Sequence, residues 1–177
     1  LLRAATHGRS LWERPIDAAS CPLVQVYVRD NLLDTGRVSP SPSNIVHPFD
    51  DTQWVYWWQS ADIKVDSPDP TTNAYAFPGL DIDYLQFEGH AHDNPRRGTW
   101  VRAYAQVHTR GNQSASNVRV RAFWADASAA LPALPSDFWT AFPNADPADT
   151  STWHPVGPTK TITSIAPGRP RIVGWSW

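Results

Sequence analysis

Methionine is absent from this chain of 177 residues, and cysteine occurs once, at Cys21. One cysteine excludes an intrachain disulfide, and its position before Pro22 in a linker-like stretch predicts an inert thiol. Blue-copper proteins need a cysteine and usually an axial methionine beside paired histidines, so we set this class aside. From the missing methionine and the apolar final residues we expect a fragment or a processed product of a longer protein.

Charged residues are also scarce, at 18% of the chain, and the net charge is −2. This balance does not favour nucleic acid or an anionic membrane as a partner. No apolar run approaches the length of a membrane span. The chain also lacks a Gly-x-Ser-x-Gly motif, and Cys21 has no histidine near it in sequence, so nucleophilic catalysis finds no support.

Proline and tryptophan are abundant instead, with 17 and 10 residues. Proline removes a backbone donor and clashes with the preceding helical turn, so this number of prolines works against long helices. Many tryptophans, β-branched runs and frequent turn residues together predict an all-β chain.

Alternation of apolar and polar residues is clearest over 23–29, 100–108 and 117–125. In the first segment the three valines share one face, which we expect to be the core face. We expect the other two segments, joined by the polar loop 109–116, to form a half-buried antiparallel unit of an immunoglobulin-like β-sandwich.

Weaker patterns predict further elements. A helix is expected over 136–142, where Ser136 can cap the first turn and Pro143 stops the last one. Residues 30–53 are expected to form a long irregular loop that contains a turn at 34–36. Short strands are expected at 54–58, 62–65, 84–87, 160–165 and 171–177.

Two parts of the chain resemble known bacterial modules. Residues 6–13, Thr-His-Gly-Arg-Ser-Leu-Trp-Glu, resemble the end of a blade in a propeller of the Asp-box (neuraminidase-repeat) type. Residues 24–177 are similar to the immunoglobulin-like "cell-adhesion-related domain found in bacteria". The motifs that carry this second resemblance are Val28-Arg29-Asp30-Asn31, Trp57-Trp58-Gln59-Ser60-Ala61-Asp62-Ile63-Lys64-Val65, and Asn94-Pro95-Arg96-Arg97-Gly98 followed by residues 101–111 and 118–125.

The resemblance implies a division of the chain and a role. Residues 1–14 would be a blade remnant, 15–22 a linker and 23–177 a sandwich that lacks its last strand. Such a domain would be a non-catalytic structural, spacer or adhesion module of a large secreted or cell-surface bacterial protein, without a cofactor. An open strand at 175–177 would let another domain or another chain dock by edge pairing.

Calcium is one candidate ligand. Asp30, Asn31 and Asp34 offer oxygen atoms on the long loop, and hard cations take such ligands. The alternative is that these side chains serve the turn through hydrogen bonds to their own backbone.

Zinc or copper is a second candidate. His90 and His92 lie two residues apart on one side of an extended segment, and His108 could complete a set of imidazole ligands. A metalloenzyme would follow from such a site. The alternative is that His90 and His92 occupy a solvated turn before Pro95.

A saccharide is a third candidate. Trp54, Tyr56 and Trp58 fall on one face of a short strand, and an exposed row of aromatic rings would stack against sugars. The chain would then be a carbohydrate-binding accessory module. The alternative is that these rings are buried in the core.

Overall fold

The computed structural model describes residues 3–4, 12–13, 24–32, 34–36, 45–47, 50–55, 60–128, 130–141, 145–147 and 150–177. The described chain consists mostly of antiparallel β-strands, with two short helices among them. The all-β prediction is therefore confirmed. The expected linker at 15–22 lies outside the described residues.

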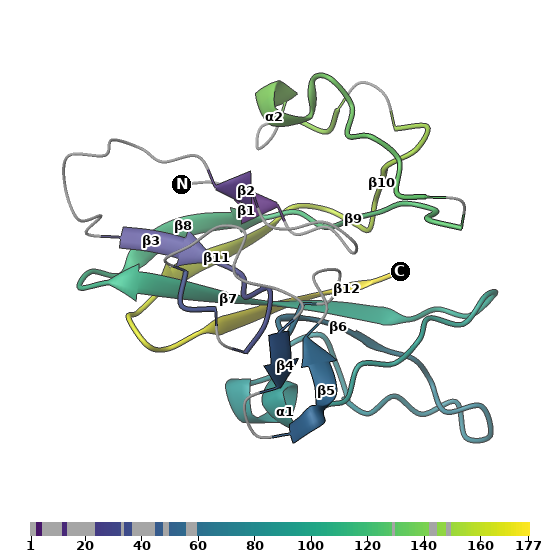
Figure 1. Cartoon of the computed structure of the whole chain (residues 1–177). Helices are drawn as coiled ribbons and strands as arrows, with labels where there is room; N and C mark the ends of the chain where they lie inside the picture. The colour runs from purple at the N-terminus through teal and green to yellow at the C-terminus, as the bar shows by residue number, and fades with distance from the viewer. Residues whose placement is uncertain are drawn as a thin grey trace.

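A ten-residue strand, β7 (Arg102–Gly111), organises the main sheet (Figure 1). Strand β12 (Arg171–Ser176) pairs with β7 along one edge. Two strands share the other edge: β6 (Ile63–Asp66) lies opposite the first half of β7, and β3 (Val24–Tyr27) lies opposite the second half. The strands predicted at 62–65 and 171–177 are thereby confirmed in position.

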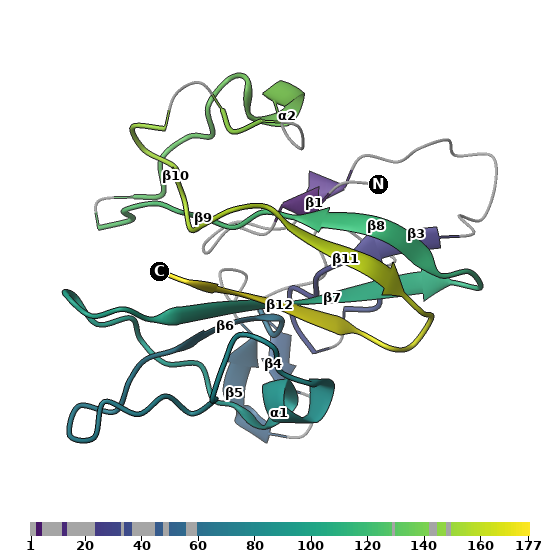
Figure 2. The ribbon, with the colours of Figure 1, turned by 180° about the vertical axis from the view of Figure 1, so that it is seen from behind.

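A second pair of strands lies over one side of this sheet (Figures 1 and 2). It consists of β8 (Ala115–Val120) and β11 (Lys160–Ile165). The expectation that 100–108 and 117–125 pair with each other is wrong, because β7 and β8 belong to different sheets. The loop after Gly111 carries the chain from one sheet to the other, and their apolar side chains meet face to face.

The smaller elements lie outside these two sheets. The prediction of one irregular loop over 30–53 is wrong, because this range contains β4 (Ile45–His47) and most of β5 (Asp50–Val55), and the two strands pair with each other. The predicted helix at 136–142 is present as α2 (Phe138–Ala141). Two further pairs are β1 (Arg3–Ala4) with β2 (Trp12–Glu13) and β9 (Phe123–Trp124) with β10 (His154–Pro155).

The first apolar cluster fills the space between the two sheets. Its buried members are Val28, Val107, Ala115, Ile162 and Ile165, and all three valines of 23–29 belong to it or pack against it. The predicted core face of this segment is therefore confirmed. Burial of such side chains stabilises the fold by roughly 1.5–3 kcal/mol each.

The second apolar cluster lies on the opposite face of β7, beneath α1 (Tyr84–Gly89). The strand predicted at 84–87 is wrong, since this segment is a helix. Asp83 caps it: the Gln86 N–H donates to the Asp83 carboxylate at 2.8 Å, and the Asp83 N–H donates to the Gln86 side chain at 2.9 Å. This reciprocal capping box outweighs the alternation, and the helix buries Phe87 completely against Tyr104 and its neighbours.

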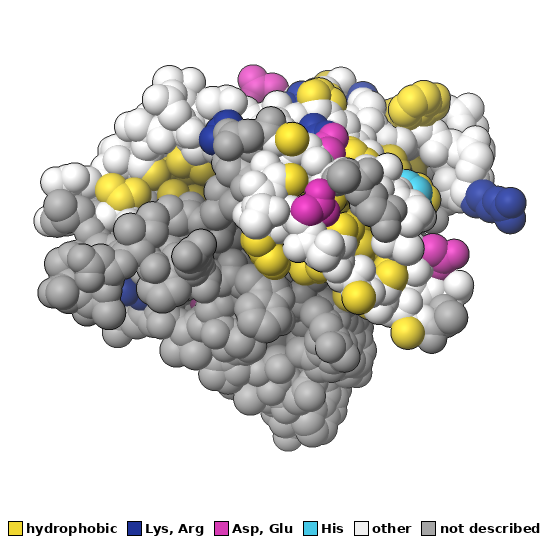
Figure 3. Space-filling view, turned by 90° about the horizontal axis from the view of Figure 1, so that it is seen from above, with side chains coloured by type: hydrophobic (Ala, Val, Ile, Leu, Met, Phe, Trp, Pro, Cys, Tyr) yellow, Lys and Arg dark blue, Asp and Glu magenta, His cyan; other side chains and the backbone are white. Residues whose placement is uncertain are grey.

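Hydrophobic side chains also reach the surface on the side of the molecule that carries α2 (Figure 3). Trp124 in β9 and Trp139 in α2 are 37% and 42% exposed. The Trp124 ring lies 5.8 Å from that of Trp177 and 4.5 Å from that of His154, measured between centroids.

Two glycines give a matched test of this packing. Gly36 and Gly168 both have a left-handed backbone, with φ of 69° and 68°. A Cβ added at Gly36 would lie 2.8 Å from the Tyr27 ring, whereas a Cβ added at Gly168 would meet no atom within 4 Å. We expect Gly168→Ala to lower the free energy of unfolding by about 1 kcal/mol, the cost of a side chain in this conformation. Gly36→Ala should cost clearly more, because the Tyr27 ring must also move. Urea unfolding of both variants checks this, and equal losses would contradict the described position of Tyr27.

Candidate functional site

The face of the main sheet that α1 covers carries polar and charged side chains in alternate positions. Successive residues along a strand point to opposite faces, so the residues that share this face on β6 and β7 are two apart in sequence. Three of them, Asp62, Asp66 and Gln106, have no exposed surface. The row includes Asp62, Lys64 and Asp66 from the β6 segment and Arg102, Tyr104, Gln106 and His108 from β7.

Asp62 is the centre of a buried ionic network. The Arg29 side chain donates to Asp62 Oδ1 through Nε at 2.8 Å and Nη2 at 2.6 Å, and the Arg29 backbone N–H donates to Oδ2 at 2.6 Å. His108 Nε2 lies 2.9 Å from the same Oδ2. A buried carboxylate needs this number of partners, because its desolvation costs several kcal/mol.

Glu88 ties helix α1 to this network. Its Oε1 accepts hydrogen bonds from Arg29 Nη2 at 2.7 Å and from Gln106 Nε2 at 2.9 Å. Burial alone would lower the pKa of Arg29, but the hydrogen bonds and charges of Asp62 and Glu88 outweigh it and raise this pKa above its ordinary value. Arg29 therefore stays charged and bridges the sheet and the helix.

Lys64 binds the end of the same helix. Its Nζ donates to the carbonyl oxygens of Phe87 and His90, both at 2.7 Å, and lies 4.5 Å from the centre of the Phe87 ring. Burial lowers the pKa of this ammonium group. A cation suits this position, because the last carbonyls of a helix lack partners of their own.

A polar cleft of about 770 Å³ opens beside Arg29 and His108. The Tyr27 ring is stacked on the His108 imidazole, with 5.2 Å between the ring centres. Two aspartates just before α1, one arginine of the turn before β12 and the first residue of β12 line the same cleft. These four residues are Asp81, Asp83, Arg169 and Arg171.

The network makes a prediction about stability. Asp62→Ala should lower the free energy of unfolding by about 3–5 kcal/mol, because Arg29 and His108 stay largely buried and lose their bonds to this carboxylate. The pair between Arg121 and Asp146, at 2.6 Å, is the control, because the Asp146 side chain is 39% exposed, and Asp146→Ala should cost about 1 kcal/mol. Urea unfolding measures both, and similar losses for the two variants would contradict the role given to Asp62.

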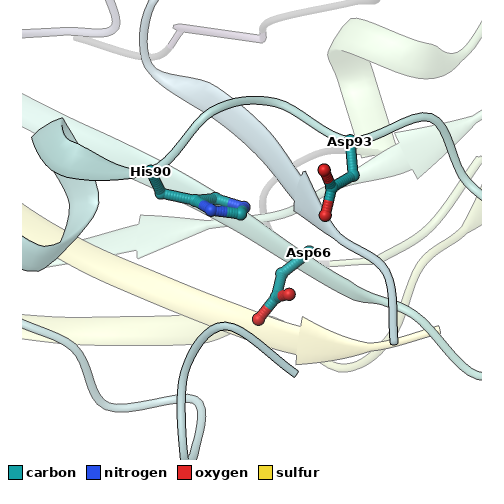
Figure 4. Close-up of side chains that lie close together, drawn as sticks. All are labelled: Asp66, His90 and Asp93. Carbon is teal, nitrogen blue, oxygen red and sulfur yellow. The ribbon is translucent and has the colours of Figure 1, made fainter. Parts of the chain in front are cut away.

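A second cluster lies on the same face, where β6 ends. One ligand atom from each of Asp66, His90 and Asp93 lies within 4.8 Å of the other two (Figure 4). Asp66 ends β6, His90 follows α1, and Asp93 lies in the next loop. Among the residues that the structure describes, these three could hold one metal ion.

The cluster is held by backbone hydrogen bonds. Asp66 accepts from the N–H groups of Ala76 at 3.0 Å and Phe77 at 3.2 Å. Asp93 Oδ2 accepts from the Ser67 N–H at 3.1 Å, and the Asp93 N–H donates to the Val65 oxygen at 2.9 Å. The two loops are thereby fixed against the end of β6.

The three histidines expected to form a zinc or copper site do not gather at one place. His92 Nδ1 accepts a hydrogen bond from the Val65 N–H at 3.2 Å, and His108 contacts Asp62. His90 lies instead beside Asp66 and Asp93. Sequence reasoning missed both aspartates, although Asp93 stands only three residues after His90.

The expected calcium ligands form the turn predicted at 34–36. Asp34 accepts from the N–H groups of Gly36 at 2.7 Å and Asp30 at 3.1 Å, and its own N–H donates to the Asn31 oxygen at 3.1 Å. The turn is confirmed, and calcium binding by Asp30, Asn31 and Asp34 stays a prediction.

The expected saccharide platform falls largely on residues that the structure does not describe. Tyr56 and Trp58 lie outside the described residues, and Trp54 is described only as part of the backbone of β5. Sugar binding by Trp54, Tyr56 and Trp58 therefore stays a prediction.

No family model, curated protein or solved structure matches this chain. Within the described residues, neither helix has the length and apolar character needed to cross a bilayer.

Proposed function

We propose that this chain is an immunoglobulin-like β-sandwich that serves as a non-catalytic structural or adhesion module of a large secreted or surface bacterial protein. It docks another strand along the outer edge of β12. The observation that carries this proposal is that no described segment pairs with the outer edge of this strand, whose residues 172–176 carry no charge.

The packing supports a sandwich. The β8–β11 pair and the main sheet share one apolar cluster, to which both contribute buried residues such as Val107 and Ile165. Two antiparallel sheets that bury their inner faces against each other are the defining arrangement of this class.

The hydrogen-bond pattern identifies the free edge. Val101 and Trp177 exchange two backbone bonds, at 2.8 and 2.9 Å, at the start of the β7–β12 ladder. Alternate residues of an antiparallel strand bond to opposite sides, so the register directs the peptide groups of Ile172, Gly174 and Ser176 away from β7. No described segment pairs with them.

The sequence of this edge favours pairing. Natural edge strands are usually protected by lysine, proline or a bulge. Residues 172–176 are Ile-Val-Gly-Trp-Ser, without a charge or a proline. A second copy of the chain is the partner that fits most simply, because antiparallel pairing about Gly174 would place Ile172 opposite Ser176 in both copies.

The ionic network supports a structural role more than a catalytic one. Asp62 is bound by Arg29 and lies against His108, and Glu88 is bound by Arg29 and Gln106. These side chains fix α1 to the sheet, which is what a spacer that must keep its shape requires.

Self-association tests the edge directly. We expect sedimentation equilibrium to show a concentration-dependent dimer, and Ser176→Pro to weaken it strongly by removing an outward N–H group. Proline is tolerated where the N–H of an edge strand faces solvent, so the fold should survive. Ser176→Thr keeps the N–H group and should dimerise normally. A monomer at all concentrations, or equal association of the proline variant, would contradict pairing through β12.

Carbohydrate binding is the second candidate function. It is supported by the exposed edge of Trp124, which lies against Trp177 and His154, because adjoining aromatic rings at a surface can stack on sugars. Affinity electrophoresis in cellulose, chitin and xylan should show retardation that Trp124→Ala removes and that Trp139→Ala leaves. Equal mobility with and without polysaccharide would exclude this function for these three polymers.

A further inference from the structure

We propose that Asp66, His90 and Asp93 form a site for one divalent cation of the zinc type, beside a cleft that the two aspartates line. This site is separate from the β12 edge and from the Asp62 network.

The two carboxylates of the cluster have no salt-bridge partner among the described residues. Asp66 has no exposed surface, and Asp93 is half-buried beside it. In the described part of the chain, no lysine or arginine forms an ion pair with either carboxylate. Buried charges are normally paired or bound to a metal, so a divalent cation would supply the missing positive charge.

Arg102 does not fill this role. It faces Asp66 across the β6–β7 pair. Its guanidinium group donates to the Phe77 carbonyl oxygen and stacks on the Tyr75 ring at 3.9 Å. These contacts hold the arginine away from salt-bridge contact with the carboxylate.

The hydrogen bond of the His90 imidazole favours a tautomer that can bind a metal. His90 Nε2 lies 3.1 Å from the Val65 carbonyl oxygen. An oxygen of this kind only accepts, so Nε2 carries the proton and Nδ1 keeps a lone pair in the neutral ring. Histidine ligands of metals commonly donate their second nitrogen to such a carbonyl. The His90 ring extends toward the two carboxylates in Figure 4.

The oxygen ligands keep capacity for an ion. Each carboxylate oxygen has two lone pairs. Each of the two Asp66 carboxylate oxygens accepts one backbone N–H. Among the described residues, the Asp93 carboxylate accepts a hydrogen bond only at Oδ2, from the Ser67 N–H. The backbone bonds thus position the carboxylates without exhausting them.

The three ligand atoms must move slightly closer together to bind one zinc ion. Tetrahedral zinc, with bonds of about 2.0–2.2 Å, places its ligand atoms roughly 3.4 Å apart. The three atoms lie within 4.8 Å of one another. Each distance between two ligand atoms must therefore shorten by about 1.4 Å or less, which side-chain rotation can supply. Two carboxylates with one imidazole suit zinc or manganese better than calcium, which prefers oxygen alone.

An open cleft borders the two aspartates of this cluster. Its volume is about 580 Å³, and both Asp66 and Asp93 line it. Three protein ligands leave a fourth position of a tetrahedral ion for water. A bound ion would therefore be exchangeable, and it would link β6 to both loops that the cluster already holds.

The experiment is titration calorimetry of the whole chain with zinc chloride, in a Cys21→Ser background so that the thiol does not compete. One equivalent of zinc should bind. His90→Gln and Asp93→Ala should each weaken the affinity about tenfold or more, by removing a ligand. His92→Gln is the matched control, since this neighbouring ring lies outside the cluster, and it should bind as the parent does.

A second readout needs no substitution in the cluster. The ¹⁵N resonance of His90 Nδ1 should shift on zinc addition, while that of His108 stays in place. If Asp93→Ala fails to fold, Asp93→Asn keeps an acceptor for the Ser67 N–H and still removes the charge. The absence of saturable zinc binding would overturn the proposal. So would an equal loss for His92→Gln, or a preference for calcium over zinc.

Discussion

The buried carboxylate of Asp62 is the constraint on which the rest of this structure depends. It has no exposed surface and needs counter-charge and hydrogen bonds from several directions. Arg29 supplies them from the end of β3 and His108 from β7. Because Arg29 is also bound by Glu88, the same carboxylate fixes where α1 must lie. One charge thus connects three segments that are distant in sequence.

The period of the β-strand then extends this constraint along the sheet. Asp62, Lys64 and Asp66 are two residues apart and share one face. Lys64 binds the carbonyl end of α1, and Asp66 binds the loop that contains Phe77. The other face of β7 is apolar and packs on β8 and β11. One face of the main sheet is therefore covered by hydrophobic contact alone, and the α1 face by charge pairing together with the apolar cluster around Phe87.

Sequence patterns predicted the parts that depend on local alternation. The valine face of 23–29 and the strands at 160–165 and 171–177 follow from a period of two. The helix at Tyr84–Gly89 was mistaken for a strand because it has only six residues, although Asp83 and Gln86 carry a capping signal. Partners of β7 and β8, and the meeting of Asp62 with Arg29 across 33 residues, depend on the path of the chain between the sheets. No local pattern contains that information.

Native-state hydrogen exchange tests most directly whether the charged face and α1 form one unit. The Gln106 N–H donates to the Asp62 oxygen within the sheet, and the Phe87 N–H donates to the Asp83 oxygen within α1. If charge pairing holds the helix in place, both amides should exchange with the same free energy, that of global unfolding. Exchange of Phe87 through a low-energy local opening, while Gln106 stays protected, would contradict this account.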